Sequence, residues 1–239
     1  MDERRHHLPR DRTAAIIVAA GSSRRMQGRD KLWIPLAGRP ILARTIDVFE
    51  SFPRVDSIIL VLNAARIAEA RELCEREGWR KIAALVAGGT RRQDSVRLGL
   101  DKLAEIAPET AWVMIHDGAR PFITAEILET GLQVAREHQA AIAAVPVKDT
   151  IKQVQEGQVS ATLDRSQLWA AQTPQIFSFP LIHQAHHSPA AEGEVTDDAA
   201  LLERLDQPVH IFPGSYTNIK ITTGEDLHFA QALLQGHPS

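Results

Sequence analysis

The chain has 239 residues, of which 44% are hydrophobic and 24% are charged, the composition of a soluble globular protein. Its net charge of -3 argues against general nucleic-acid binding, and no apolar run approaches the ~18 residues of a membrane-spanning helix. The single cysteine, Cys74, excludes an intrachain disulfide and a cysteine-rich metal site. We therefore expect a cytoplasmic protein without nucleic-acid or membrane partners, with a disordered tail at residues 1–13 and a single domain over 14–239.

Predicted strands and helices alternate along the first 147 residues. Apolar runs predict strands over residues 14–20, 57–62, 82–87, 112–115 and 140–147. Amphipathic patterns predict helices over residues 40–51, 64–77, 92–105 and 124–138. Continuous apolar strands between amphipathic helices indicate a parallel sheet that is covered on both faces. Ligands of such sheets bind beyond the carboxyl ends of the strands.

The pattern changes after residue 148. Residues 149–154 and 159–164 alternate apolar and polar side chains around Glu156-Gly157, which predicts a β-hairpin that projects as an arm. Beyond it we predict helices near residues 180–187 and 196–205, a strand near 210–212, a short strand ending at Lys220, and a helix over 224–234.

The loop after the first strand is rich in cations. Gly21 follows the strand and lets the backbone approach a ligand closely, and Arg24, Arg25 and Lys31 come next. This pattern favours a site for a polyanion such as a nucleoside triphosphate, although neither G-x-x-x-x-G-K-[ST] nor G-x-G-x-x-G is present. An ordinary basic surface loop is the alternative.

Further polar segments follow other predicted strands. They are residues 88–95, 116–121, 145–150, 162–165 with 172–175, 195–198 and 218–222. The histidines are not expected to bind a metal, and His186-His187 is predicted to be exposed.

Together these segments resemble the 2-C-methyl-D-erythritol 4-phosphate cytidylyltransferase family of the non-mevalonate isoprenoid pathway. The resemblance covers roughly residues 13–235 and rests on H-D-G-A-R-P at 116–121, D-R-x-x-L-W-x-A-Q-T-P-Q at 164–175 and N-I-K-I-T at 218–222. It implies a Rossmann-like three-layer α/β nucleotidyltransferase sheet and a homodimer held by the arm at about residues 149–165. It also implies transfer of a cytidylyl group from CTP to 2-C-methyl-D-erythritol 4-phosphate, which gives 4-diphosphocytidyl-2-C-methyl-D-erythritol and pyrophosphate.

The resemblance assigns roles to individual residues. The residues matching catalytic positions are Arg25, Lys31 and Lys220. Those matching nucleotide-binding positions are Ala19, Ala20, Gly21, Gly88, Gly89, Thr90, Ser95 and Gly118. Those matching acceptor-binding positions are Asp117, Arg120, Thr150, Arg165, Thr173 and Thr196. Mg²⁺ is expected to be held mainly by the CTP phosphates, with Asp117 as a candidate protein ligand.

The chemistry is consistent with these residue types. A phosphate monoester has a second pKa of about 6, so it is mostly a dianion at pH 7 and needs no general base to attack the α-phosphorus. The remaining task is to hold two anions together and to stabilise the charge of the transition state, which positioned cations can do.

Several assignments have structural alternatives. Thr196 also suits a helix N-cap, Arg165 could form a surface pair with Asp164, Ser95 could be a plain helix residue, and Gly88-Gly89 and Asp117-Gly118 could be simple turns. Two features depart from the family: Thr217 stands where many members have Asp before Asn-Ile-Lys, and the loop at residues 27–30 is short.

Three other functions stay open at this point. A ribitol-phosphate cytidylyltransferase would differ in its acceptor. A molybdenum-cofactor nucleotidyltransferase shares the opening loop but does not account for the arm or the T-P-Q run. A non-catalytic nucleotide-binding dimer would release no pyrophosphate.

Overall fold

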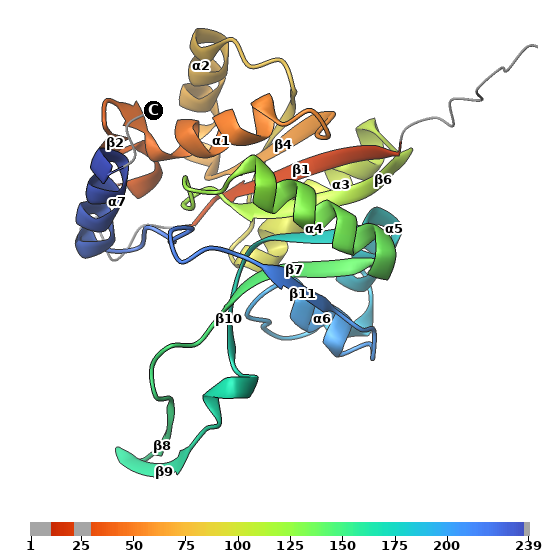
Figure 1. Cartoon of the computed structure of the whole chain (residues 1–239). Coiled ribbons are helices and arrows are strands. Elements are labelled where there is room, and N and C mark those ends of the chain that lie inside the picture. Colours follow the sequence, from red (N-terminus) through yellow and green to blue (C-terminus); the bar gives the residue numbers. More distant parts are fainter. Residues whose placement is uncertain (1–10, 22–29, 237–239) are drawn as a thin grey trace, which may run out of the picture.

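A seven-stranded sheet organises the computed structural model, which describes residues 11–21 and 30–236 (Figure 1). The strand order is β11-β7-β10-β6-β1-β4-β5. The strands are β1 Arg12–Ala19, β4 Ser57–Leu62, β5 Ile82–Ala87, β6 Thr110–Asp117, β7 Ala140–Pro146, β10 Trp169–Ser178 and β11 His210–Pro213. Strand β10 runs antiparallel to β6 and β7, whereas the other neighbouring pairs are parallel. The expectation of an all-parallel sheet is therefore wrong, although the predicted α/β class is confirmed.

Strand β10 was absent from the predicted elements, and Pro174 is the reason. Proline cannot donate a ladder hydrogen bond, so a proline within a polar run argues against a central strand. The sheet accommodates Pro174 through a register shift between Ala171 and Gln175 in the pairing with β7. This irregularity lets a ten-residue strand pass through the middle of the sheet.

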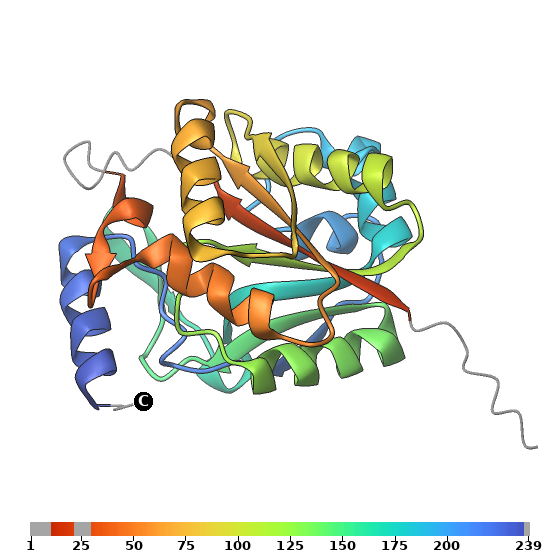
Figure 2. The same cartoon turned by 90° about the horizontal axis from the view of Figure 1, so that it is seen from above.

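Helices cover both faces of the sheet, as Figure 2 shows. The helices are α1 Ile41–Ser51, α2 Ile67–Glu77, α3 Arg92–Ile106, α4 Ala125–His138, α5 Phe179–His186, α6 Ala199–Glu203 and α7 Gly224–Gly236. Alternate residues of β1 separate two buried cores: Ala15 and Ile17 pack with residues of α1, α2, α4 and α7, and Ala14 and Ile16 pack with residues of α3, α5 and α6. The predicted three-layer arrangement is thus confirmed. None of the described helices combines the length and apolar character needed to cross a bilayer.

Short elements complete the chain. They are the 3-10 helices η2 Lys31–Trp33, η3 Ala64–Arg66, η4 Arg165–Gln167 and η5 Pro189–Ala191, and the strand pair β2 Pro35–Leu36 and β3 Arg39–Pro40. Three predicted boundaries need correction. Strand β1 begins at Arg12, inside the predicted tail, and residues 1–10 lie outside the described residues. The predicted strand ending at Lys220 is wrong, because residues 214–223 form neither helix nor strand, and the helix predicted over 196–205 is only the five residues of α6.

The predicted hairpin arm is confirmed. Strands β8 Lys152–Gln155 and β9 Gln158–Thr162 pair antiparallel and project away from the seven-stranded sheet (Figure 1). Glu156 and Gly157 both have positive φ, 49° and 81°, as a two-residue type I′ turn requires. Val154 and Val159 are 56% and 62% exposed, so the isolated chain leaves apolar side chains of the arm in solvent.

Candidate active site

Two adjoining cavities lie at the carboxyl edge of the central strands. The larger, about 710 Å³, is lined at the end of β1 by Ala19, Ala20 and Gly21, beyond β5 by Gly89 and Thr90, and by Lys31 and Ser95. The smaller, about 250 Å³, is lined by Arg120, Thr173 and Thr196 among others. Arg92, Asp117 and Lys220 line both cavities. Most residues of the two predicted binding sets are therefore brought to one place, as the strand-end rule indicates.

Two predicted nucleotide-binding glycines lie just behind the wall of the larger cavity. A Cβ on Gly88 would stand 2.2 Å from Ala20 Cβ and 2.8 Å from Ser95 Oγ. Gly118 donates its backbone N–H to Val18 O at 2.9 Å, and a Cβ there would lie 3.3 Å from Ala19 Cβ. Position 88 therefore needs glycine because the strand ends pack so closely, whereas a Cβ at Gly118 would only be tightly packed. Ser95 donates to Arg91 O at 3.1 Å and accepts from Gly89 N at 3.1 Å, so its hydroxyl shapes this turn.

Asp117 is the anionic centre of the shared wall. Its Oδ2 lies 2.8 Å from Lys220 Nζ and 3.7 Å from Arg120 Nε, and its Oδ1 lies 3.2 Å from Arg92 Nε. Burial by itself would raise the pKa of Asp117, but Arg92, Lys220 and Arg120 hold that pKa well below its usual range. The carboxylate is therefore ionised and fixes three cations, of which Arg92 and Lys220 line both cavities and Arg120 lines the smaller one.

Arg92 is a residue of the shared wall to which sequence analysis assigned no role. It stands at the start of α3, and its Nη1 lies 2.8 Å from Oδ2 of the buried Asp198. Burial opposes its charge, but Asp198 and Asp117 together raise the pKa of the guanidinium. Asp198 lies 106 positions further along the chain, so no local pattern pairs the two residues. The only local signal was that Arg92 falls within one of the strand-end segments.

His186 supports this network from α5, and its predicted exposure is wrong. Its side chain is buried, and Nε2 lies 3.4 Å from Asp198 Oδ1. Phe179, Ile182 and His186 share the buried stripe of α5, at the spacing of an amphipathic helix. His187, just past the end of this helix, is exposed as predicted.

A buried histidine and Thr173 hold the backbone of Asp117. Thr173 Oγ1 accepts from Asp117 N at 3.0 Å and lies 3.1 Å from His116 Nδ1, while His116 Nε2 lies 3.1 Å from Arg120 O. Because the carbonyl can only accept, the proton is assigned to Nε2, and Thr173 donates to Nδ1. Burial lowers the pKa of His116 to about 4, so the ring is neutral at pH 7. The Thr173 hydroxyl is thereby engaged in the wall, although the residue lines the smaller cavity.

The segment that carries Lys220 is docked on the two other motif segments. Arg120 Nη1 donates to Asn218 O at 2.7 Å, and Ile221 N donates to Ala119 O at 2.9 Å. Buried Asn218 donates through Nδ2 to Thr173 O at 2.9 Å. These bonds connect H-D-G-A-R-P, Q-T-P-Q and N-I-K-I-T, so an irregular segment can place Lys220 accurately.

Local structure accounts for three further positions. Thr217, which departs from the family pattern, has its hydroxyl hydrogen-bonded within its own loop, because Thr217 Oγ1 lies 2.7 Å from Ser215 Oγ. Thr196 is not a helix N-cap, because α6 begins three residues later with Asp198 at its cap.

Lys31 stands at the edge of the larger cavity because Asp30 caps η2 through Leu32 N at 3.3 Å, and Leu32 is buried in the core.

Two predicted acceptor-binding residues, Thr150 and Arg165, do not line the described cavities. They lie at the base of the arm, where Arg165 Nη1 donates to Lys148 O at 2.8 Å. The proposed surface pair of Arg165 with Asp164 is not among the ion pairs of the described residues, and Asp164 instead accepts from Ser166 N. Arg25 and residues 27–29 of the short loop lie outside the described residues.

A mixed α/β sheet that gathers cations around two adjoining cavities at its carboxyl edge is the arrangement of a nucleotidyltransferase. The model of the family 2-C-methyl-D-erythritol 4-phosphate cytidylyltransferase matches residues 13–236, and the chain belongs to this family.

Named relatives agree with this assignment. The 2-C-methyl-D-erythritol 4-phosphate cytidylyltransferase of Dehalococcoides mccartyi (strain CBDB1) is 47% identical over 226 residues, which are 94% of this chain and 97% of that protein. The protein of the same name from Geobacter metallireducens is 46% identical over 224 residues, 92% of this chain and 97% of its own. The crystal structure of 4-diphosphocytidyl-2C-methyl-D-erythritol synthase from Anaerococcus prevotii matches with a TM-score of 0.83 at 34% identity and covers 94% of this chain and 96% of that one.

Proposed function

We propose that this chain transfers the cytidylyl group of CTP to 2-C-methyl-D-erythritol 4-phosphate, releasing pyrophosphate, as a step of isoprenoid precursor biosynthesis. Family membership supports the reaction. The observation that carries it is the pair of cavities with a common wall of Arg92, Asp117 and Lys220. A transfer requires that the α-phosphate of one substrate and the phosphate of the other meet, and a shared wall provides such a meeting point.

The larger cavity suits CTP and the smaller suits the acceptor. Strand-end backbone at Ala19, Ala20 and Gly89 offers rigid groups that can recognise the edge of a small base. Near the smaller cavity, Arg92 Nη2 and Arg120 Nε are buried and have no hydrogen-bond partner among the described residues. Buried donors without an acceptor are costly, and phosphate oxygens would satisfy them.

The reaction needs no protein base. An oxygen of the acceptor phosphate dianion attacks the α-phosphorus of CTP, the bond between that phosphorus and the bridging oxygen breaks, and its electron pair leaves with pyrophosphate. Lys31 and Lys220, with Arg25 as the resemblance implies, stabilise the charge that develops. His116 is not a candidate base, because both ring nitrogens are engaged behind the wall.

Mg²⁺ fits the substrates better than the described side chains. Three cations stand within 3.7 Å of the Asp117 carboxylate, which opposes binding of a divalent ion there. We therefore place Mg²⁺ on the phosphate oxygens of CTP and on water, as this ion prefers. There it would supply neutralising charge.

Pyrophosphate release with the four common nucleoside triphosphates and a panel of sugar-alcohol phosphates tests the assignment. CTP should be used far better than ATP or GTP, because a purine exceeds a site closed around one pyrimidine ring. Methylerythritol phosphate should outcompete ribitol phosphate. Equal turnover with ATP, or a preference for ribitol phosphate, would refute the nucleotide or the acceptor assignment. The absence of pyrophosphate with every pair would instead favour a non-catalytic nucleotide-binding protein.

The arm supports a second part of the proposal, a homodimer. A two-stranded hairpin is marginally stable alone, and the exposed Val154, Val159 and Leu163 offer apolar area to a partner. In a two-fold dimer each arm would pack on the other subunit. Arg165 and Thr150 could then reach the partner's acceptor cavity, which they do not reach in their own chain.

Mixing two inactive variants tests this arrangement. Lys31→Ala and Arg165→Ala homodimers should each be nearly inactive. A heterodimer of the two would hold one doubly damaged site and one intact site, so co-refolding should restore a substantial fraction of activity. Verified heterodimers that stay as inactive as their parents would contradict the composite site, and a monomeric wild type would contradict the dimer itself.

A further inference from the structure

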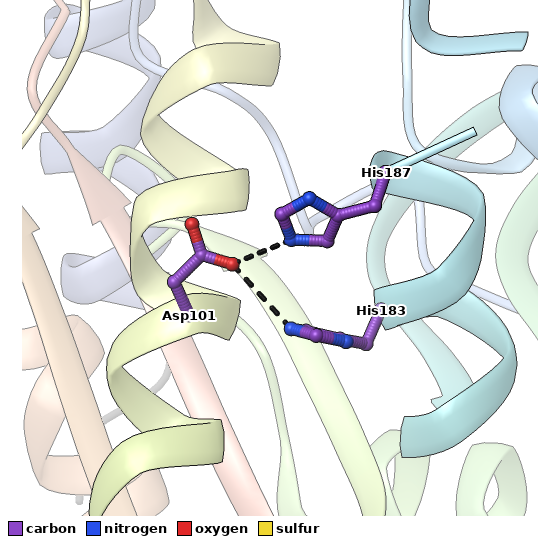
Figure 3. A group of neighbouring side chains, drawn as sticks. All are labelled: Asp101, His183 and His187. Carbon is purple, nitrogen blue, oxygen red and sulfur yellow. Dashed lines mark hydrogen bonds and ion pairs between the residues drawn. The ribbon is translucent and has the colours of Figure 1, made fainter. Parts of the chain in front are cut away.

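Three side chains that can bind metals meet where α3 packs against α5. Asp101 projects from α3, and His183 and His187 project from the end of α5 toward it (Figure 3). His187 Nε2 lies 2.7 Å and His183 Nε2 lies 3.4 Å from the same oxygen, Asp101 Oδ1. The potential ligand atoms all lie within 4.8 Å of one another. The two histidines form an H-x-x-x-H pattern, which places side chains on one helix face, and the expectation of no histidine metal site overlooked it.

We propose that Asp101, His183 and His187 bind one Zn²⁺ ion or a similar divalent transition metal. Two imidazole nitrogens and one carboxylate are a ligand set that zinc uses with an open fourth position. Between 32% and 43% of each side chain is exposed, so water can occupy that position. With zinc–ligand distances of about 2.1 Å, neighbouring tetrahedral ligands lie about 3.4 Å apart. The His183 distance matches this spacing, and His187 would need to withdraw by roughly 0.7 Å.

The local charges act in both directions. The carboxyl end of α5 carries partial negative charge, which favours a cation beside His183 and His187. Arg97 opposes a cation, because its Nη1 lies 3.3 Å from Asp101 Oδ2. That contact also occupies the oxygen remote from the histidines and leaves Oδ1 facing them. Neutralising Arg97 should therefore strengthen metal binding.

This site is separate from the proposed Mg²⁺ position. Asp101 lies nine residues beyond Arg92 on α3, which is about 14 Å along the helix axis. None of its three ligands lines either cavity. Imidazole suits zinc, copper and nickel, whereas Mg²⁺ prefers oxygen ligands and keeps its water. Excess Mg²⁺ should consequently not displace the ion.

Calorimetric titration of the metal-stripped full chain with ZnCl₂, in excess Mg²⁺ and without nucleotide, tests the proposal. The wild type should bind one more Zn²⁺ than the His183→Gln/His187→Gln double variant, and each single variant should weaken this site at least about tenfold. Arg97→Gln should tighten it. His138→Gln is the matched control, since His138 stacks on His210 in another part of the fold and should leave zinc binding unchanged.

Further readouts separate binding from folding. Zn²⁺ should raise the Tm of the wild type but not that of the double variant. Co²⁺ should show visible absorption bands of an imidazole-ligated ion that the double variant lacks. If the double variant fails to fold without metal, Asp101→Asn replaces it, because the amide keeps a hydrogen-bond acceptor but removes the charged ligand. Equal zinc stoichiometry and affinity in wild type and variant, or no zinc binding by the wild type, would overturn the site.

Discussion

The neutral, buried His116 should make the stability of this protein fall as the solution becomes mildly acidic. Burial lowers its pKa to about 4 in the folded state, whereas an unfolded histidine titrates near about 6.5. Between these values the unfolded chain binds a proton that the folded chain does not, so stability is lost as the pH falls through this window. Proton linkage then lowers the free energy of unfolding by about 2 kcal/mol between about pH 7.5 and about pH 5, and by about 3 kcal/mol once pH 4 is reached.

Urea unfolding of wild type and His116→Gln at the two pH values measures this loss. All other groups are common to both proteins, so the difference between the two pH dependences isolates His116. The variant should be less stable at pH 7.5, because two hydrogen bonds are disturbed, yet its stability should fall about 2 kcal/mol less on acidification. The same pH dependence in both proteins would refute a neutral His116 in the folded state. At pH 5 and above the carboxylates of Asp117 and Asp198 stay ionised in both states, because an unfolded Asp titrates near about 3.9 and the pKa of each is lowered further in the folded state.

Three shorter predictions concern the cavities. Lys31→Ala should lower kcat by roughly 10² to 10³, the loss of one preorganised group that stabilises transition-state charge, and unchanged turnover at saturating CTP would contradict its role. Gly88→Ala should destabilise the fold by about 1–3 kcal/mol in urea titrations, because the new Cβ would lie 2.2 Å from Ala20 Cβ. The shifted turn should also raise the KM for CTP. An unchanged KM would show that this turn does not border CTP. Asp198→Asn should lower the free energy of unfolding, measured in urea, by about 3 kcal/mol. This is the lower end of the range for a broken buried ion pair, because Arg92 keeps its second partner, Asp117. A loss under about 1 kcal/mol would show that the Arg92–Asp198 pair is not needed for stability.

The sequence was sufficient for elements whose pattern is local. Strands β1 and β4 are continuous apolar runs, and α4 has a clear N-cap at Thr124, whose side chain accepts from Ile127 N. Strand β10 could not be recognised in this way, because its polar residues and Pro174 resemble a loop and only its two neighbours make it a strand. The Lys220 segment gave the opposite error: a strand was predicted there, but the segment is irregular and side-chain bonds hold it in place.

The candidate site was predictable to the extent that strand ends define it. Lys220 and Asp117 came from separate motifs and lie 2.8 Å apart. The pairing of Arg92 with Asp198 depends on how α3 packs beside the turn before α6, which no local pattern determines. The burial of His186 was accessible, since the amphipathic stripe of α5 includes it.

The common wall of the cavities has a consequence for how the two substrates share electrostatic attraction. Arg92, Arg120 and Lys220 lie beside Asp117 and Asp197 in the smaller cavity, and Asp198 pairs with Arg92 behind it, so three cations meet three carboxylates and no net positive charge is left at the junction. A triphosphate and a phosphate dianion bring several negative charges to it. Each substrate must therefore change the affinity of the other, and linkage makes that factor identical in both directions. The shared wall cannot neutralise the substrate phosphates by itself. The neutralising positive charge has to come from cations that bind together with the nucleotide, or from residues that line only the larger cavity, such as Lys31.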